Sequence, residues 1–471
     1  MIDRPPFKFA AETFGSIQLW LTIVVLCLAP LFFGSVDQLA IAVWTVVLSI
    51  SALCGVAQPL SVWQSRILFA FLALCFAYAL VAVMQVAPHL FDQLNDPSWQ
   101  RANGLLGLDL SPRISSRAEI PPASIGHFLL LVTSFMSGLF VGTSRRNSDL
   151  LILCARYSIL SYAVYGLLAL VFTPDMLLWI PKLAYRGSLT ATFVNHNTAA
   201  TFIGAGVILW FCSAFLSLQS FQYSSIRMLL LLPSNERVAI KVIFRSAAGL
   251  TCFFALLLTG SRGGLICSSL GLLVAISLMI ANRVKPGFWY AVGAGSVALA
   301  GTAVWLSQMG RIGSQGLFDD ARWSVYGYCI DAIRQRPLLG SGAGTFGDLF
   351  PSLRTDDFST WGVWDYAHST ILEIAVEMGI PIAAMVVMAS VASLVILAQA
   401  ALRSKDRGRS TLSAITGIAL LSYLHSMIDF SLQIPGYLIL FGILLGCGLA
   451  RASEPTKTPR TESRELASLT A

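Results

Sequence analysis

Residues 67–87 read ILFAFLALCFAYALVAVMQVA, a run without a single charged side chain. A helix needs about 20 mostly apolar residues to cross the hydrocarbon core of a bilayer. This run therefore has the length and the composition of a transmembrane helix. Similar runs follow one another along the chain, separated by short polar segments.

The whole composition agrees with that run. Of the 471 residues, 56% are hydrophobic and only 12% are charged, whereas a soluble domain carries about 25% charged residues. The sequence therefore predicts an all-α, polytopic membrane protein. Its twelve expected spans lie near residues 17–35, 38–57, 67–87, 125–143, 151–172, 198–218, 242–260, 263–281, 288–306, 379–400, 411–430 and 435–450.

The net charge of +7 reflects topology rather than binding of nucleic acid, because the basic residues lie between the apolar runs. The positive-inside rule places the basic loops and both termini in the cytoplasm of a bacterial inner membrane. Residues 1–450 then form the membrane domain, with a retained first helix, and 451–471 form a disordered cytoplasmic tail. The basic residues assigned to the inside are Arg66, Arg145, Arg146, Arg227, Arg237, Lys241, Arg245, Arg283, Lys285, Arg403, Lys405, Arg407 and Arg409.

Three periplasmic segments, 88–124, 173–197 and 307–372, are too long to be simple turns. Their basic residues, with Arg262 in a short outer turn, are almost all arginine, which suits bidentate recognition of phosphate. In the longest loop, apolar residues 323, 326, 330 and 333 have helical spacing and Arg334 and Arg336 precede Pro337. They predict a short amphipathic helix on the membrane surface. The glycines of 340–344 lack a preceding strand, so they indicate a flexible turn rather than a nucleotide loop.

Arg262 lies in the sequence TGSRGG (259–264) between two spans. The free N–H groups at the start of the following helix, together with a guanidinium, make a natural phosphate site. The alternative is an arginine that only anchors a helix end at the interface.

His368 stands just outside the tenth span, where a neutral imidazole can accept a proton from a sugar hydroxyl. The alternative is a histidine with a purely structural role. Glu377 lies half a helical turn out of phase with His368, and we assign it to structure. His425 and Asp429 are four residues apart on the eleventh span, which predicts a buried pair, structural or in a proton relay.

Taken together, these motifs resemble the O-antigen ligase and polymerase superfamily over residues 180–435. They are Arg186 with Asn195-His196-Asn197, the turn 259–264, the loop RQRPLLGSGAGTF (334–346), and His368-Ser369 with Glu377-Met378-Gly379. The resemblance implies a GT-C-like membrane glycosyltransferase that takes a saccharide from a polyprenyl diphosphate carrier at the periplasmic face. It also implies inversion at the anomeric carbon, no metal, no other cofactor and no nucleotide-sugar.

The same resemblance assigns roles to individual residues. Arg186 and Arg262 correspond to the arginines of the family that stabilise the departing diphosphate, and His368 to the histidine at the end of its long loop. Asn195, Asn197 and Arg322 complete the expected substrate-binding set. His196 and Ser369 depart from the residues common in the family, so neither is given a catalytic role.

The sequence leaves the acceptor open between lipid A core, a growing polysaccharide and a protein hydroxyl, and hence leaves ligase and polymerase open. A different class is a secondary transporter or flippase, which also has many spans. Transporters of that kind carry internal repeats and ionisable residues near the midplane. Most spans here lack charge and the loops are unequal, which favours the enzyme.

Overall fold

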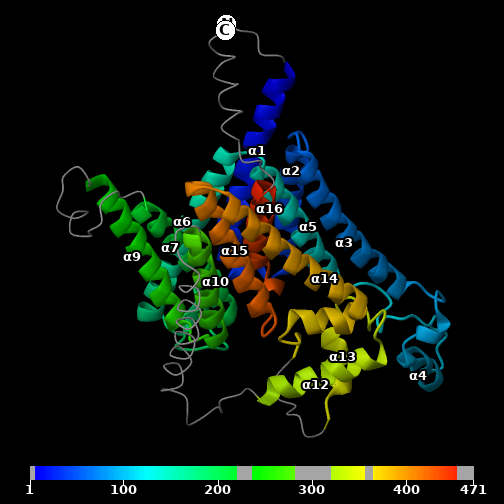
Figure 1. Ribbon diagram of the computed structural model, residues 1–471. Coiled ribbons are helices and arrows are strands. Elements are labelled where there is room, and N and C mark those ends of the chain that lie inside the picture. The colour runs from blue at the N-terminus through cyan, green and yellow to red at the C-terminus, as the bar shows by residue number, and fades with distance from the viewer. Residues whose placement is uncertain (1–5, 220–235, 282–319, 356–363, 453–471) are drawn as a thin grey trace.

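The computed structural model describes residues 6–219, 236–281, 320–355 and 364–452, and these are almost entirely helical (Figure 1). Within these ranges the only strands are β1 (Met176–Leu177) and β2 (Ile180–Pro181), which pair antiparallel. The helices are α1 (Pro6–Leu28), α2 (Gln38–Gly55), α3 (Val62–Val86), α4 (Pro97–Leu106), α5 (Pro122–Gly142), α6 (Arg145–Phe172), α7 (His196–Gln219), α9 (Glu236–Leu258), α10 (Arg262–Ile280), α12 (Asp320–Gln335), α13 (Phe346–Leu353), α14 (Thr370–Arg403), α15 (Asp406–Ser426) and α16 (Pro435–Ala452).

Ten of the described helices have the length and apolar composition needed to cross a membrane. They confirm the predicted all-α polytopic class. The predicted span near 288–306 lies outside the described residues. The ten helices are α1, α2, α3, α5, α6, α7, α9, α10, α14 and α16.

The predicted span near 411–430 corresponds to α15, which is too polar to count with the ten and ends at Ser426. Its serine and threonine side chains are mostly buried, and Thr416 and Ser422 donate hydrogen bonds to carbonyls one turn earlier. α15 packs against α7, α10 and α14. Because protein rather than lipid surrounds it, this helix does not need the hydropathy of a lipid-facing span.

Small residues bring the central helices into backbone contact. α16 is the most buried of the ten spans, with 89% of its central window inside the protein. A Cβ atom on Gly138 of α5 would overlap the carbonyl oxygen of Ile443, and one on Gly446 of α16 would overlap that of Phe135. Glycine at these positions is therefore what allows α5 and α16 to pack so closely.

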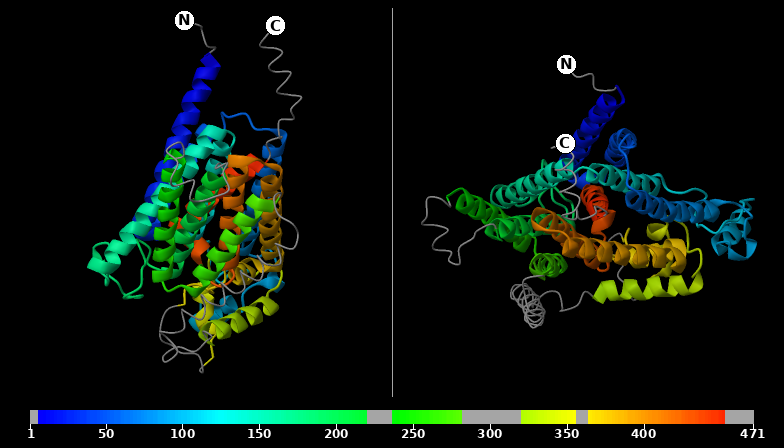
Figure 2. Two further views of the ribbon diagram at one scale, coloured as in Figure 1. Left: turned by 60° about the vertical axis from the view of Figure 1, so that its left-hand side comes forward. Right: turned by 45° about the horizontal axis from the view of Figure 1, so that its top comes forward.

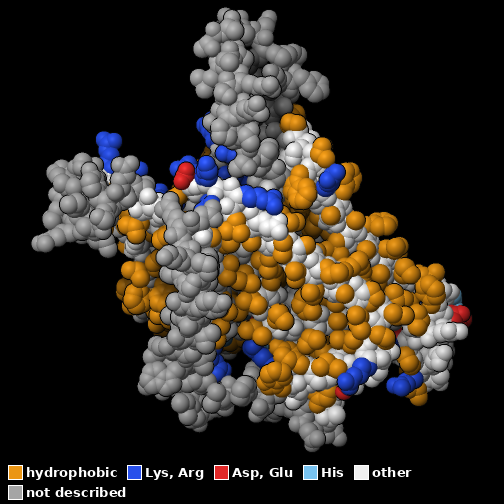
Figure 3. Space-filling view, viewed as in Figure 1, with side chains coloured by type: hydrophobic (Ala, Val, Ile, Leu, Met, Phe, Trp, Pro, Cys, Tyr) orange, Lys and Arg blue, Asp and Glu red, His pale blue; other side chains and the backbone are white. Residues whose placement is uncertain are grey.

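The two ends of the bundle differ in what they carry. α1 starts and α16 finishes at one end (Figure 2), while α4, α12 and α13 gather at the other (Figure 1). Between these ends the visible surface is a broad apolar belt, with Lys and Arg side chains above and below it (Figure 3). Such a belt matches the hydrocarbon core of a bilayer. We call the end with α12 and α13 the outer end.

The helix predicted before Pro337 is present as α12, and it packs against the rest of the protein mainly through its smaller side chains. Trp323 and Ile330 are exposed. The smaller side chains on the other side of α12 fit against α13 and the start of α14, which leaves the bulky residues outward. The buried cluster consists of Val325, Cys329, Ala332, Phe346, Phe350, Ala367 and Val376.

α14 consists of two parts separated at Gly379, whose φ of 81° is left-handed. A Cβ at this position would overlap the carbonyl oxygen of Leu338, so glycine is required both by the backbone angle and by the close contact. The Ile380 N–H donates to the carbonyl of Pro337 at 2.8 Å. Residues 370–378 therefore belong to the outer end, and only 380–403 form the span.

Candidate functional site

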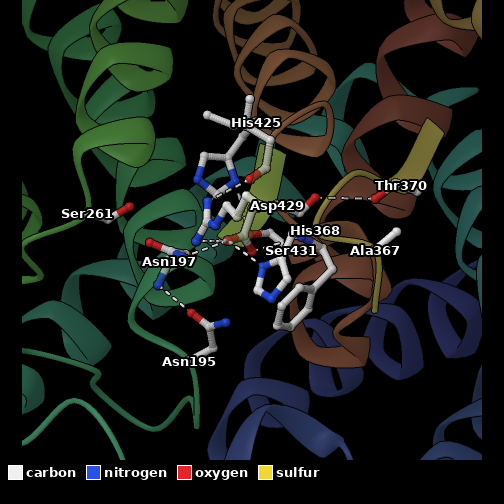
Figure 4. A network of polar contacts seen from close by, with 12 residues as sticks. Asn195, Asn197, Ser261, Ala367, His368, Thr370, His425, Asp429 and Ser431 are labelled. Atoms are coloured by element: carbon white, nitrogen blue, oxygen red, sulfur yellow. Dashed lines mark hydrogen bonds and ion pairs between the residues drawn. The ribbon is translucent and has the colours of Figure 1, made fainter. Parts of the chain in front are cut away.

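Segments that are far apart in the sequence meet at the outer end of the bundle (Figure 4). The Leu189 N–H donates to the carbonyl of Leu258 at 2.9 Å, which joins the loop after β2 to the end of α9. The ring of His196, at the start of α7, is hydrogen-bonded through Nδ1 to the carbonyl of Thr259 at 2.7 Å. These two contacts fix the Arg186 loop, the start of α7 and the Arg262 turn to one another.

Asp429 is at the centre of the polar contacts. Its side chain is only 1% exposed. Its Oδ2 accepts a hydrogen bond from Asn197 Nδ2 at 2.6 Å and lies 3.8 Å from Arg322 Nη2 and 3.9 Å from His368 Nδ1. Its Oδ1 accepts from the Phe430 N–H at 2.8 Å. One carboxylate thus gathers groups from α7, α12, the segment before α14 and the segment after α15.

The charge of this carboxylate follows from its neighbours. Burial would raise the pKa of Asp429, but His368, His425 and Arg322 outweigh burial and hold that pKa below its ordinary value. Asp429 is therefore ionised at neutral pH. A buried anion of this kind stabilises cationic or donor groups placed against it.

His368 is held in an unusual backbone conformation beside this carboxylate. Its φ is 54°, left-handed for a non-glycine residue, and its carbonyl accepts from the hydroxyl of Tyr326 at 2.9 Å. The ring lies edge-on to Trp364 and Phe430, with centroid distances of 5.1 and 4.9 Å. Its buried Nδ1 has no hydrogen-bond partner among the described residues, so the nearby Asp429 is the group toward which it can donate.

Glu373 joins the two segments that carry His368 and Asp429. One oxygen of Glu373 accepts from the Ala367 N–H at 2.7 Å, and the other accepts from Gln433 Nε2 at 2.9 Å. The left-handed turn at His368 is therefore held by a buried side chain one turn into α14. Sequence reasoning missed this residue, and its only signal is a carboxylate placed in an otherwise apolar helix.

Arg262 is the first residue of α10, as the turn predicted. Ser261 caps this helix, because its side chain accepts from the Gly264 N–H at 3.1 Å. The Arg262 side chain is half-buried and forms no hydrogen bond or ion pair with another described residue. A Cβ on the adjacent Gly263 would lie 3.5 Å from Nε2 of His425, which places the turn against the polar cluster.

Arg186 lies on the exposed rim of the site. Its Nε donates to the carbonyl of Lys182 at 3.2 Å, and Lys182 in turn donates to the carbonyl of Ser188 at 2.9 Å. The neighbouring Tyr185 stacks on His196 with a centroid distance of 4.1 Å. Burial, and then the charge of Asp429, raise the pKa of Tyr185. Arg186 thus borders the cluster without a bond to its other predicted members.

The two predicted asparagines are buried and have partners within the chain. Asn195 Oδ1 accepts from the Asn197 N–H at 2.7 Å and so caps the start of α7. Asn197 holds Asp429, as described above. This gives Asn195 a structural contact and places Asn197 in direct contact with the central carboxylate.

His425 and Asp429 are both buried, as predicted, but no hydrogen bond or ion pair joins their side chains. α15 ends at Ser426, so the four-residue spacing does not place the two side chains on one helical face. Nδ1 of His425 lies 3.1 Å from the hydroxyls of Thr201 and Ser431. His425 supports the cluster from the membrane side, while Asp429 turns toward His368.

The glycine-rich segment 340–344 is a cradle for a carboxylate rather than a flexible turn. Glu377 accepts from the N–H groups of Gly344 at 2.9 Å and Phe346 at 3.0 Å. Gln85 of α3 completes the contact, accepting from the Ala343 N–H at 2.9 Å and donating to the carbonyl of Glu377 at 2.7 Å. Glu377 is thus bound to the backbone of this segment, as expected of a residue with a structural role.

Across the described ranges, no group of three His, Cys, Asp or Glu side chains has the geometry to hold a metal ion. The sequence contains two acidic pairs that could invite a metal, Asp319-Asp320 and Asp356-Asp357. Of these four residues, Asp319, Asp356 and Asp357 lie outside the described residues. The arginines and the histidine of the cluster are donors and proton acceptors rather than ligands for a hard cation.

The family model for O-Antigen ligase matches residues 247–388, from the middle of α9 into α14. This range includes Arg262, Arg322 and His368. No curated protein matches the chain. The chain is therefore a multi-pass membrane protein whose residues 247–388 are similar to the O-antigen ligase family, which confirms its resemblance to the O-antigen ligase and polymerase superfamily.

Proposed function

We propose that the protein transfers a saccharide from a polyprenyl diphosphate carrier to a hydroxyl acceptor at the periplasmic face of the bacterial inner membrane. The transfer would serve lipopolysaccharide or exopolysaccharide synthesis, with lipid A core or a growing polysaccharide as acceptor. The observation that carries the proposal is the approach of His368 to the buried Asp429, beside Arg322 and close to the Arg262 turn. We assign the reaction to residues 180–435.

The reaction is a single displacement. The acceptor oxygen attacks the anomeric carbon, its proton passes to Nε2 of His368, and the bond from the anomeric carbon to the diphosphate oxygen breaks. The electron pair leaves with the diphosphate, so the anomeric configuration inverts. His368 fits the role of base because Asp429 lies on the Nδ1 side of the ring and favours the tautomer whose Nε2 is unprotonated.

The arginines stabilise the charge that grows on the leaving group. Arg262 has no intramolecular partner among the described residues and stands at a helix N-terminus, where N–H groups and the helix dipole favour an anion. Arg186 on the rim supplies a second guanidinium from another segment. Donors placed in advance act more strongly on the transition state than on the bound carrier.

The proposal makes the lipid-linked saccharide the complete donor. The purified protein should therefore convert a polyprenyl-linked saccharide and an acceptor to product in the presence of a chelator, without a nucleotide-sugar. Strict dependence on a divalent ion or on a nucleotide-sugar would reject this mechanism.

A transporter or flippase is the alternative, and the same assay separates the two classes. An enzyme forms product in detergent solution, where no compartments exist, whereas a transporter forms none. In cells, a deletion strain should accumulate either unattached polymer, as expected of a missing ligase, or single repeat units, as expected of a missing polymerase.

A further inference from the structure

Two arginines from different helices meet at α7, at the end of the bundle opposite to the candidate site. Arg156 of α6 donates through Nη1 to the hydroxyl of Ser213. Arg245 of α9 donates through Nη1 to the carbonyl of Ser213 at 3.1 Å and to the hydroxyl of Ser217. Both serines lie in the last two turns of α7, while the candidate site lies at its first turn.

This pair of arginines has no carboxylate partner among the described residues. Asp149 attracts Arg156 only weakly, and its two oxygens are held by Arg407 at 3.2 Å and by Arg451 at 3.0 Å. Arg407 lies close enough to repel both Arg156 and Arg245. The segment 220–235, which joins α7 to α9, contains no Asp or Glu. The described cluster thus has four arginines and one acid.

The pair also has N–H donors without an acceptor. A guanidinium carries five N–H donors, and Nε of Arg156 is buried without a partner. The Arg156 guanidinium lies over the ring of Trp210, 5.4 Å from its centroid, so the aromatic face covers one side and leaves the edge for an acceptor. Buried donors of this kind need an acceptor.

The residues around the pair are of the kinds that gather near lipid headgroups. The rings of Tyr157, Trp210 and Phe244 contact one another, with centroid distances of 5.2 Å between the first two and 5.7 Å between the last two. Aromatic side chains gather at the interface between membrane and water. On α9, Arg237, Lys241 and Arg245 follow one another at a spacing of four residues, so a basic stripe leads to the pair.

We propose that Arg156 and Arg245 bind a phosphate group, that of an anionic phospholipid in the leaflet at this end of the bundle. Planar guanidinium groups match phosphate oxygens in pairs, and basic pockets between spans bind anionic headgroups. Capping of α7 explains the bond from Arg245 to the carbonyl of Ser213. It does not explain the unpaired Nε of Arg156 or the excess of positive charge. Inorganic phosphate has the same chemistry, so the experiment includes it.

The test measures ligand binding to the purified full chain in neutral detergent, by native mass spectrometry and by the thermal midpoint. The probes are dioleoyl phosphatidylglycerol, dioleoyl phosphatidylcholine and inorganic phosphate. Phosphatidylglycerol should bind and raise the midpoint, and phosphatidylcholine should not. The double variant R156Q/R245Q should lose about tenfold or more in affinity for phosphatidylglycerol.

The matched control is R403Q/K405Q, which removes the same charge from exposed positions in and just after the last turn of α14 and should keep wild-type affinity. If phosphate alone raises the midpoint, with the same dependence on Arg156 and Arg245, the site holds and its ligand is soluble. Equal binding of the two lipids with no effect of phosphate overturns the proposal, and so does unchanged affinity in R156Q/R245Q. Should that variant fail to fold, Arg245→Lys keeps the charge and loses the fork, and wild-type affinity in Arg245→Lys overturns the proposal equally.

Discussion

The proposed role of Arg262 requires its planar guanidinium, whereas an arginine that only anchors a helix at the interface requires only the positive charge. Arg262→Lys keeps the positive charge but loses the planar fork that holds two phosphate oxygens. We expect turnover of the lipid-linked donor to fall by about 10²–10³-fold, as for loss of one transition-state donor. The measurement is the rate of product formation by wild-type and variant proteins, purified and compared at equal concentration.

The control for this prediction is Arg403→Ala, at the opposite end of the bundle. This variant should keep nearly the wild-type turnover of the lipid-linked donor. An arginine that only anchors α10 at the interface would be replaced by lysine without loss. Wild-type turnover in Arg262→Lys would therefore remove Arg262 from the proposed site.

Asp429 is predicted to act through His368. In Asp429→Asn the neutral amide no longer favours the tautomer of His368 whose Nε2 is unprotonated, so kcat should fall while KM for the lipid-linked donor stays close to the wild-type value. Because the folded-state pKa of Asp429 lies below its unfolded value, the carboxylate also stabilises the fold above about pH 4 and loses that contribution as the pH falls further. Two measurements separate the effects: the thermal midpoint as a function of pH reports the contribution of Asp429 to the fold, and kcat at neutral pH reports its action on His368. A purely structural role would lower the midpoint and leave kcat per folded molecule unchanged.

The sequence identified several residues of the candidate site, but it did not show which of them contact one another. His368, Arg262 and Asn197 were singled out, and all lie at the outer end of the bundle. The role of Asp429 was missed, because a four-residue spacing indicates a shared helical face only if the helix continues, and α15 ends before Asp429. Glu373 was missed because its partners, Ala367 and Gln433, come from segments whose proximity the sequence does not show.

At the scale of elements, the cradle around Glu377 depends on glycine at positions that the backbone makes strict. Gly340 has a φ of 66°, and a Cβ there would overlap the carbonyl of Glu377. Gly340→Ala should therefore destabilise the outer end by more than about 2 kcal/mol, from the left-handed angle and the overlap together. The measurement is thermal unfolding in detergent, followed by protease cleavage near α13.

Gly327 provides the matched control for this substitution. It lies within α12 and has open space around its Cβ position. Gly327→Ala should be neutral or stabilise by about 0.5–1 kcal/mol, because alanine is the better helix former. Equal effects of the two substitutions would contradict the cradle.

The elements also show where periodicity is informative and where it is not. The long apolar runs predicted the spans well, because lipid demands apolar residues all around a helix. The helix α12 was predicted correctly, and its place on the membrane surface stays a prediction: Trp323 and Ile330 are exposed, while smaller side chains pack against α13. The glycine-rich segment 340–344 was predicted to be a flexible turn. The sequence could not show that it binds a carboxylate, because Glu377 is 33 residues away from Gly344.

For the whole molecule, the prediction concerns sidedness. Reporters inserted at α13 should indicate a periplasmic location, and reporters placed after Lys405 a cytoplasmic one, because the basic loops lie at the end where α1 begins. The measurement is a pair of fusions, one to alkaline phosphatase and one to a cytoplasmic fluorescent protein. The reverse assignment would put His368 and Arg262 on the wrong face and end the enzyme interpretation.

The central position of α16 has a consequence for how the protein is made. α16 leaves the ribosome after every other described helix, yet it fills the middle of the bundle and meets the backbone of α5, which was synthesised some 300 residues earlier. During translation, α5 is therefore in the membrane before its partner, and the surface around Gly138 has no contact with α16 until α16 is inserted. A chain that stops before Pro435 would therefore lack its centre rather than its edge. The centre of the bundle therefore forms only after α16 has been inserted.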